Sequence, residues 1–214
     1  MDSTLEYFVK KFNIDLNKKS PIDIPNINRT LMAQTFNELG FTTGAEIGVA
    51  QGEHSELLCK NIPNLKLYCV DIWERYKGYL EYTNRITRYY EEAKEKLAPY
   101  NCILLKDFSM DAIKYFKNDS LDFVYIDGAH DFKNVADDVC EWSKKVRIGG
   151  VVYGHDFKRS KGKYQNAVKD VIPAYCYQFG IVPWFILGER GRSDGMFKEG
   201  IQSWMYIRLD NNAN

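Results

Sequence analysis

The chain has 214 residues, 45% of them hydrophobic, which is enough for one globular domain with a full-sized core. Its 29 basic and 29 acidic residues cancel, so no net charge favours nucleic acid or an acidic membrane surface as a partner. The five cysteines show no C-x-x-C spacing, and there is neither a membrane-spanning apolar run nor a signal-peptide pattern. We therefore expect a cytoplasmic protein with reduced thiols.

Strands and helices are predicted to alternate along the chain, which indicates a parallel sheet covered by helices on both faces. The expected strands are residues 45–49, 66–71, 102–106, 121–126, 150–155, 184–187 and 203–209. The expected helices are residues 28–39, 54–61, 82–97, 109–116, 132–145 and 164–179. This order predicts an α/β fold with a doubly wound, Rossmann-like sheet of seven strands, mostly parallel, ending in an antiparallel strand.

We expect a single domain over residues 1–214. Residues 1–40 are predicted to form a helical cover and residues 41–160 the cofactor-binding core. Residues 161–214 are predicted to supply a C-terminal helix and edge strands. No linker, internal repeat or low-complexity tract divides the chain.

The first strand and the loop that follows it carry the strongest functional signal. Gly48 and Gly52 lie in a loop between a predicted strand and a predicted helix, and the next strand ends in Asp71. Loop glycines let the backbone approach a ligand, and an acid at the end of the second strand is placed to bind ribose hydroxyls. The arrangement predicts a nucleoside-binding site.

The spacing of this loop argues against a dinucleotide. A dinucleotide site needs G-x-G-x-x-G, but Ala50 and Glu53 occupy the second and third glycine positions. The pattern present is E-x-G-x-x-x-G, with Glu46 inside the strand. A carboxylate there repels a pyrophosphate but suits a ligand with an ammonium and a sulfonium group, which points to S-adenosylmethionine.

Three sequence blocks together resemble a known family. They are AEIGVAQG at 45–52, VDIW at 70–73, and DFVYIDGAH at 122–130 with its partner GGVVYGHD at 149–156. Their order resembles class I S-adenosylmethionine-dependent methyltransferases, in the small O-methyltransferase-like branch that includes catechol-, caffeoyl- and macrocin-type enzymes. The resemblance covers about residues 40–160. The segments on either side carry no motif that we match to it.

The resemblance implies a set of cofactor contacts. It places Glu46 beside the methionine amino group, directly or through water. His54 and Ser55 lie at the helix start near the same part of the cofactor, where His54 is expected to order the loop. Trp73 either stacks on the adenine or packs under a lid. The junction after the third strand encloses the adenine, which makes Asp107, Phe108 and Ser109 candidates. Ser109 is equally open to interpretation as a plain helix N-cap.

Two acids at the ends of neighbouring strands suggest the chemistry. Asp127 ends the fourth predicted strand and Asp156 the fifth, so both carboxylates should meet at one sheet edge. In the catechol- and caffeoyl-type enzymes, acids at these places and a third Asn or Asp bind a magnesium ion. Phe157 stands at the third position and cannot coordinate an ion. A Mg²⁺ or other divalent cation on Asp127 and Asp156 therefore needs His155, Asp131 or water to complete its shell.

Two histidines lie in the same predicted site. His130 follows Asp127 by three residues, where the catechol-type enzymes carry a lysine, and is a candidate general base; the alternative is a helix-capping role. We assign His155 a structural or ligand-orienting part in catalysis. Asp137 and Asp138, on the helix that follows, are interpreted as solvated residues.

The predicted function is S-adenosylmethionine-dependent O-methylation of a small-molecule or sugar hydroxyl. One alternative is a nucleotide-binding oxidoreductase or sugar-nucleotide enzyme on a similar sheet. Another is a non-catalytic cofactor-binding module. Nucleic acid is disfavoured as a substrate because an N-P-P-Y-type tetrapeptide is absent after the fourth strand. We expect no membrane partner, and both a monomer and a homodimer remain open.

Overall fold

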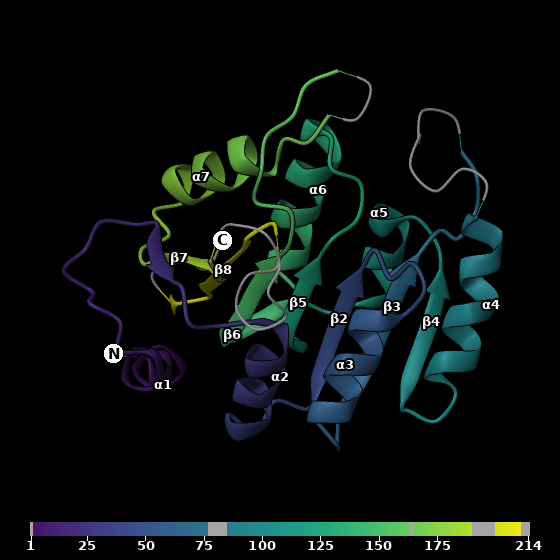
Figure 1. Ribbon diagram of the computed structural model, residues 1–214, viewed down its shortest axis with the longest axis horizontal. Coiled ribbons are helices and arrows are strands. Elements are labelled where there is room, and N and C mark those ends of the chain that lie inside the picture. The colour runs from purple at the N-terminus through teal and green to yellow at the C-terminus, as the bar shows by residue number, and fades with distance from the viewer. Residues whose placement is uncertain (1, 77–84, 163–164, 190–199, 211–214) are drawn as a thin grey trace.

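The computed structural model describes residues 2–76, 85–162, 165–189 and 200–210. In these residues eight strands form one sheet in the order β1-β7-β8-β6-β5-β2-β3-β4 (Figure 1). All neighbouring pairs are parallel except those of β8, which runs antiparallel to β6 and β7. The strands are β1 (Ile22–Ile24), β2 (Thr43–Ile47), β3 (Lys66–Asp71), β4 (Cys102–Lys106), β5 (Leu121–Ile126), β6 (Val146–Gly154), β7 (Trp184–Leu187) and β8 (Ser203–Ile207).

The mostly parallel α/β sheet with an antiparallel last strand agrees with the sequence prediction, with one strand added. The extra strand, β1, pairs in parallel with β7 at the sheet edge. It has only three residues, and prolines lie at 21 and 25 beside it. A segment this short carries too little alternation to be read as a strand from sequence.

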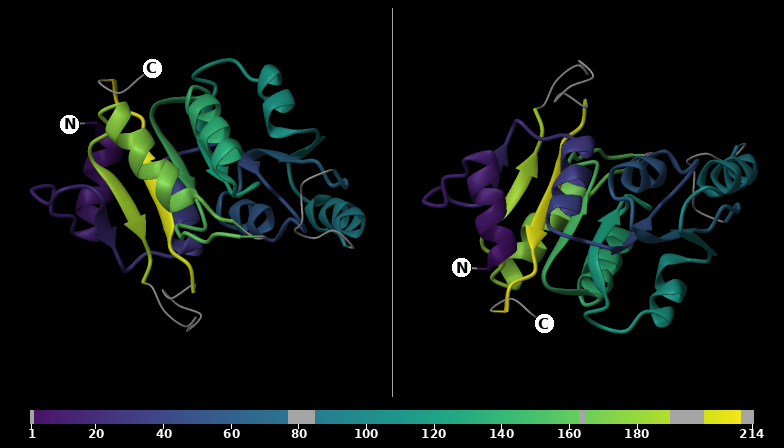
Figure 2. Two further views of the ribbon diagram at one scale, coloured as in Figure 1. Left: turned by 90° about the horizontal axis from the view of Figure 1, so that it is seen from above. Right: turned by 90° about the horizontal axis from the view of Figure 1, so that it is seen from below.

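The helices form two layers, one on each face of the sheet (Figure 2). One hydrophobic cluster joins the sheet to residues of α1 (Ser3–Phe12), α2 (Arg29–Glu38), α3 (Glu53–Asn61) and α4 (Ile86–Leu97). A second cluster joins the other face to α5 (Ser109–Ala112), α6 (Phe132–Ser143) and α7 (Val168–Gln178). A 3-10 turn, η1 (Ile113–Tyr115), follows α5. Phe123 and Val124, neighbours on β5, belong to opposite clusters, as the two-residue period of a strand requires.

Strand boundaries determine where the site lies. The predicted strands 66–71, 102–106, 121–126 and 184–187 are found with those bounds, whereas β6 begins at Val146, four residues earlier than expected. The predicted helices 82–97 and 164–179 begin outside the described residues. In Figure 1 the arrowheads of β2, β3, β4 and β5 all point to one edge of the sheet, so their following loops gather there. Among the described residues no helix is both long and apolar enough to cross a membrane.

Candidate active site

A large cavity opens at the carboxyl edge of the parallel strands. Its volume is about 840 Å³, enough for a nucleoside cofactor together with a small second ligand. Residues that follow β2, β3, β4, β5 and β6 line it, including Gly48, Asp71, Asp107, Asp127 and Asp156. The sheet edge therefore brings the predicted cofactor-binding residues and the two predicted catalytic acids into one cavity.

Position 48 requires glycine for two reasons, its backbone conformation and the close approach of another loop. Its φ is +89°, and a Cβ placed there would lie 2.2 Å from the carbonyl oxygen of Asp127. Any side chain at this position would therefore push apart the loops that follow β2 and β5. Gly52, with φ +77°, is the N-cap of α3 and does not line the cavity.

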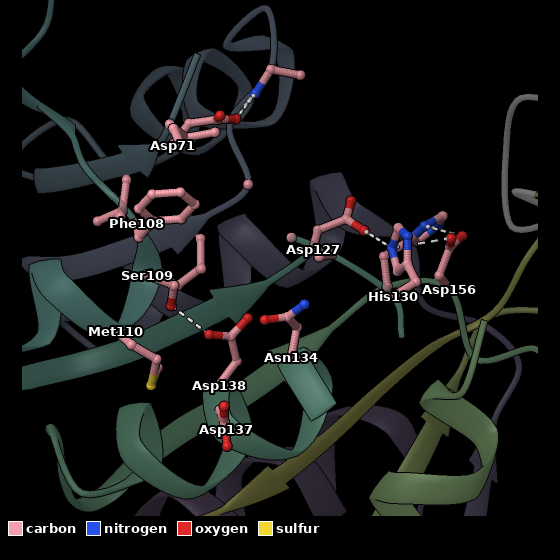
Figure 3. A pocket seen from close by; sticks show the side chains of 18 of the residues that line it. Asp71, Phe108, Ser109, Met110, Asp127, His130, Asn134, Asp137, Asp138 and Asp156 are labelled. Carbon is pink, nitrogen blue, oxygen red and sulfur yellow. Dashed lines mark hydrogen bonds and ion pairs between the residues drawn. The ribbon is translucent and has the colours of Figure 1, made fainter. Parts of the chain in front are cut away.

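Asp71 fixes the glycine loop from the end of the next strand. Its Oδ2 accepts hydrogen bonds from the backbone N–H groups of Val49 and Ala50, both at 2.9 Å, and its Oδ1 accepts one from the N–H of Trp73 at 3.0 Å. The carboxylate also lines the cavity, as Figure 3 shows. One side chain thus holds the loop in shape and offers its remaining lone pairs to a ligand.

Glu46, His54 and Ser55 lie beneath this loop and are not part of the cavity lining. Glu46 is 2% exposed, and its carboxylate accepts a hydrogen bond from the hydroxyl of Ser55. Burial raises the pKa of Glu46 well above its usual range. His54 is buried too, 3.3 Å from the hydroxyl of Tyr153. These three side chains support the loop from below, as expected for His54, and the contacts of Glu46 and Ser55 with the cofactor stay predictions.

Trp73 has a supporting position as well. The side chain is fully buried, its Nε1–H donates to the carbonyl oxygen of Ala50 at 2.7 Å, and its ring packs on Tyr90 at 5.0 Å between centroids. It does not line the cavity. The indole thus packs beneath the glycine loop, in line with the packing role that the sequence left open, and its stacking on adenine stays a prediction.

The junction of β4 and α5 forms one end of the cavity. Asp107, Phe108 and Ser109 all line it. Phe108 is half-exposed, and its ring meets the ring of Tyr76 edge-on at 5.2 Å. Ser109 is not the N-cap, since α5 is capped by Phe108. Its hydroxyl instead donates to Asp138 and accepts from the indole N–H of Trp142 at 2.7 Å.

Asp138 is a cavity residue that the sequence analysis misassigned to solvent. It lies on α6, is 4% exposed and lines the cavity. Burial raises its pKa to about 7. The sequence does indicate this burial, because Val135, Asp138, Val139 and Trp142 have the i, i+3, i+4, i+7 spacing of one helix face. Asp138 therefore shares the buried stripe of α6.

Asp127, His130 and Asp156 converge at the other end of the cavity (Figure 3). The Nε2 of His130 lies 3.3 Å from Oδ1 of Asp127 and 3.2 Å from Oδ2 of Asp156. The two acids come from the ends of β5 and β6, while Asp131, not His130, caps α6 with its side chain. The helix-capping alternative for His130 thus has no support in the geometry.

Asp156 is surrounded by hydrogen-bond donors. Nδ1 of His155 lies 3.2 Å from its Oδ1, and Asn166 Nδ2 and Lys158 Nζ lie 3.2 and 3.3 Å from its Oδ2. Burial alone would raise the pKa of Asp156, but the His155 hydrogen bond, the charges that His130 and His155 carry when protonated, and the ammonium of Lys158 lower it to about 2. Asp156 is therefore ionised throughout the physiological pH range.

The donor set of this cluster fits a divalent cation. One atom from each of Asp127, His130 and Asp156 lies within 4.8 Å of the other two, and carboxylate oxygen and imidazole nitrogen are common ligands of such ions. Phe157, in contrast, is buried and packs against Trp184 at 6.0 Å. The third donor that the sequence could not supply at Phe157 is present in the structure as His130.

The fold and the cavity together define a class of α/β proteins that hold a nucleoside cofactor across the carboxyl ends of parallel strands. Residues 45–157, more than half of the chain, match the family model described as "Methyltransferase domain". The chain belongs to this methyltransferase family, as the sequence resemblance predicted. No curated protein sequence matches it.

Solved structures resemble the whole fold at low sequence identity. An O-methyltransferase from Bacillus cereus in complex with S-adenosylhomocysteine is 15% identical, with a TM-score of 0.60, covering 97% of this chain and 92% of that one. The O-methyltransferase TomG from Streptomyces achromogenes, in complex with S-adenosylmethionine, is 14% identical, with a TM-score of 0.61 and coverages of 97% and 91%. An rRNA methylase from Streptococcus thermophilus is 11% identical, with a TM-score of 0.58 and coverages of 86% and 98%. At these identities the likeness establishes the fold.

Proposed function

We propose that the protein is an S-adenosylmethionine-dependent O-methyltransferase acting on a hydroxyl group of a small molecule or sugar. Family membership and two similar structures that hold S-adenosylmethionine or its demethylated product support the cofactor. The cavity fits it, because Gly48 and Asp71 lie beside the Asp107–Ser109 junction in one continuous space. The family also favours this reading over a nucleotide-binding oxidoreductase.

The observation that carries the choice of oxygen as acceptor atom is the Asp127–His130–Asp156 cluster in the same cavity. A hydroxyl is a poor nucleophile at neutral pH and needs a group that removes its proton. The cluster offers an imidazole held between two carboxylates, 3.3 and 3.2 Å from its Nε2. Ser160 and Gln165 also line the cavity and offer a hydroxyl and an amide group of the kind that binds polyols.

The reaction asks three things of the chain: alignment, proton removal and exclusion of water. S-adenosylmethionine, when bound, supplies a sulfonium methyl group whose transfer to oxygen gives a methyl ether, a neutral thioether and one proton. The imidazole of His130, whose Nε2 lies beside both carboxylates, takes up the proton of the acceptor hydroxyl. Asp127 and Asp156 then offset the charge of the imidazolium.

A divalent cation on the same three side chains would supply a different kind of activation. It would lower the pKa of an acceptor hydroxyl by direct charge stabilisation. Asp156 already lies beside the ammonium of Lys158 and the nitrogens of His130, His155 and Asn166, so both of its oxygens have partners without an ion. We therefore assign proton removal to His130 in the principal mechanism.

The proposal is tested in two stages with the full chain. Calorimetry with S-adenosylhomocysteine should show 1:1 binding. Release of S-adenosylhomocysteine from S-adenosylmethionine is then followed with panels of phenols, free sugars, nucleotide sugars and short RNA, after dialysis against EDTA and after adding Mg²⁺ or Mn²⁺. We expect turnover with a hydroxyl compound in EDTA.

The outcomes separate the parts of the proposal. Absence of S-adenosylhomocysteine binding would overturn the cofactor. Turnover confined to RNA would overturn the acceptor class. Turnover that disappears in EDTA and returns with a cation would transfer the activating role from His130 to the ion.

A further inference from the structure

Asp138 lies at the end of the cavity where the cofactor's base must sit, and the proposed mechanism gives it no role. Asp71 at the end of β3 is the predicted ribose ligand, and a base attached to that ribose would extend toward the next loop, formed by Asp107, Phe108 and Ser109 after β4. Asn134 and Asp138 of α6 line that same end. An adenine there carries an exocyclic amino group that needs a hydrogen-bond acceptor.

The carboxyl group of Asp138 is built as a fixed acceptor. Its Oδ1 accepts the hydroxyl of Ser109, whose oxygen in turn accepts the indole N–H of Trp142 at 2.7 Å. Its Oδ2 has no hydrogen-bond partner among the described residues and lies 3.5 Å from the position of a Cβ built on Gly128, another residue of the cavity wall. Figure 3 shows the carboxyl pointing from α6 toward Ser109, on the cavity side of the helix.

The unpaired oxygen of this largely buried residue is the reason to look for a ligand. A carboxylate that is 4% exposed with an unpaired oxygen costs free energy unless a donor meets it. The other acids at this end are already engaged: Asp137 with Lys133, Asp111 with Lys114 at 4.0 Å, and Asp107 with the N–H of Phe108 at 3.0 Å. Of these four acids, only Asp138 is buried and also has a carboxylate oxygen that makes no hydrogen bond to the described residues.

We propose that Oδ2 of Asp138 accepts a hydrogen bond from the exocyclic amino group of the cofactor's adenine and makes the cavity selective for a 6-amino purine over a 6-oxo purine. This inference rests on the proposed S-adenosylmethionine function. It assigns base recognition to α6, in addition to the β4–α5 junction. A 6-oxo purine would face the same oxygen with an acceptor of its own, and two acceptors repel.

The hydrogen bond with Ser109 determines how the amide group is oriented in Asp138→Asn. The hydroxyl hydrogen of Ser109 needs an acceptor, because its oxygen is occupied by Trp142. In the variant the amide oxygen must therefore face Ser109, and the amide NH₂ takes the place of Oδ2. The variant then presents a donor to the base. Recognition should shift from the 6-amino toward the 6-oxo purine.

The test compares S-adenosylhomocysteine with S-inosylhomocysteine by calorimetry at pH 8, where Asp138 is mostly ionised. Wild type should prefer the adenosyl compound by about tenfold or more, the discrimination expected when a buried acceptor loses its donor. Asp138→Asn should bind the inosyl compound more tightly than wild type does and reduce the preference by about tenfold. Glu141→Gln, a change at a partly exposed position of the same helix that does not line the cavity, is the matched control and should keep the wild-type preference.

A second measurement needs no variant at Asp138. Wild type should bind an analogue with a dimethylated 6-amino group, which has no N–H, about tenfold or more weakly than S-adenosylhomocysteine. Equal affinity for the adenosyl and inosyl compounds, or an unchanged preference in a folded Asp138→Asn protein, would overturn the role of Asp138 while leaving the cofactor in place. Failure of wild type to bind any of the three compounds would overturn the proposed function and this inference with it.

Discussion

Nε2 of His130 lies 3.2 Å from Oδ2 of Asp156, although the two residues belong to different loops at the sheet edge. The contact depends on strand register, because Ile126 of β5 pairs with Gly154 of β6 and the loops after both strands begin at the same level. Asp156 then turns with φ +56°, a left-handed conformation that aspartate tolerates better than most residues. The cluster therefore forms because β5 and β6 are parallel neighbours whose following loops meet at one edge of the sheet.

Asp71→Ala should weaken binding of S-adenosylhomocysteine by about 1–3 kcal/mol, because the ribose hydroxyls lose a charged acceptor and the glycine loop loses its two backbone hydrogen bonds to the carboxylate. Calorimetry measures the change. Asp23→Ala, at an exposed position of β1, should bind as wild type does. Unchanged affinity in Asp71→Ala would show that the second strand's acid is not the ribose ligand.

Gly48→Ala should destabilise the protein far more than Gly180→Ala. Both residues have positive φ, +89° and +61°, so each substitution carries a conformational cost of about 1–2 kcal/mol. Only at Gly48 does the new Cβ also meet backbone, 2.2 Å from the Asp127 carbonyl oxygen, whereas nothing lies within 4 Å at Gly180. Chemical denaturation of both variants measures the difference. Equal losses would mean that the two loops can separate without cost.

Asp138 should make folding stability fall as pH rises. Its folded-state pKa, about 7, is raised above the ordinary 3.8, so between these values the unfolded chain has lost a proton that the folded protein keeps. The free energy of unfolding therefore decreases by about 1.4 kcal/mol per pH unit from this group over that window. Asp138→Asn removes the contribution. Denaturation of both proteins at pH 5, 6 and 7 should show the variant gaining relative to wild type; a constant difference would contradict the raised pKa.

The core of the fold and most of the cavity could be predicted from sequence because they depend on local patterns. Residues 121–126 form a nearly continuous apolar run, which is typical of a central parallel strand, and the acid after it falls at the strand end. Asp71, Asp107 and Asp127 could be placed at the cavity because each of them ends or directly follows a predicted strand.

Side-chain direction was the part that sequence could not supply. Glu46 and Trp73 lie close in the chain to residues that line the cavity, yet both point beneath the loop, where Ser55 and the Ala50 carbonyl bind them. Whether a side chain at a strand end faces the ligand or the core depends on neighbouring elements distant in sequence. For Asp138, the helical spacing in the sequence already held the information.

The central claim is that the Asp127–His130–Asp156 cluster removes the proton of the acceptor hydroxyl. The most direct measurement is single-turnover methyl transfer by His130→Gln on the acceptor found for wild type, with S-adenosylhomocysteine affinity measured in parallel. We expect a rate about 10²–10⁴-fold lower, the usual contribution of a general base, with cofactor affinity within about twofold of wild type. A folded His130→Gln protein that transfers the methyl group at the wild-type rate would contradict it.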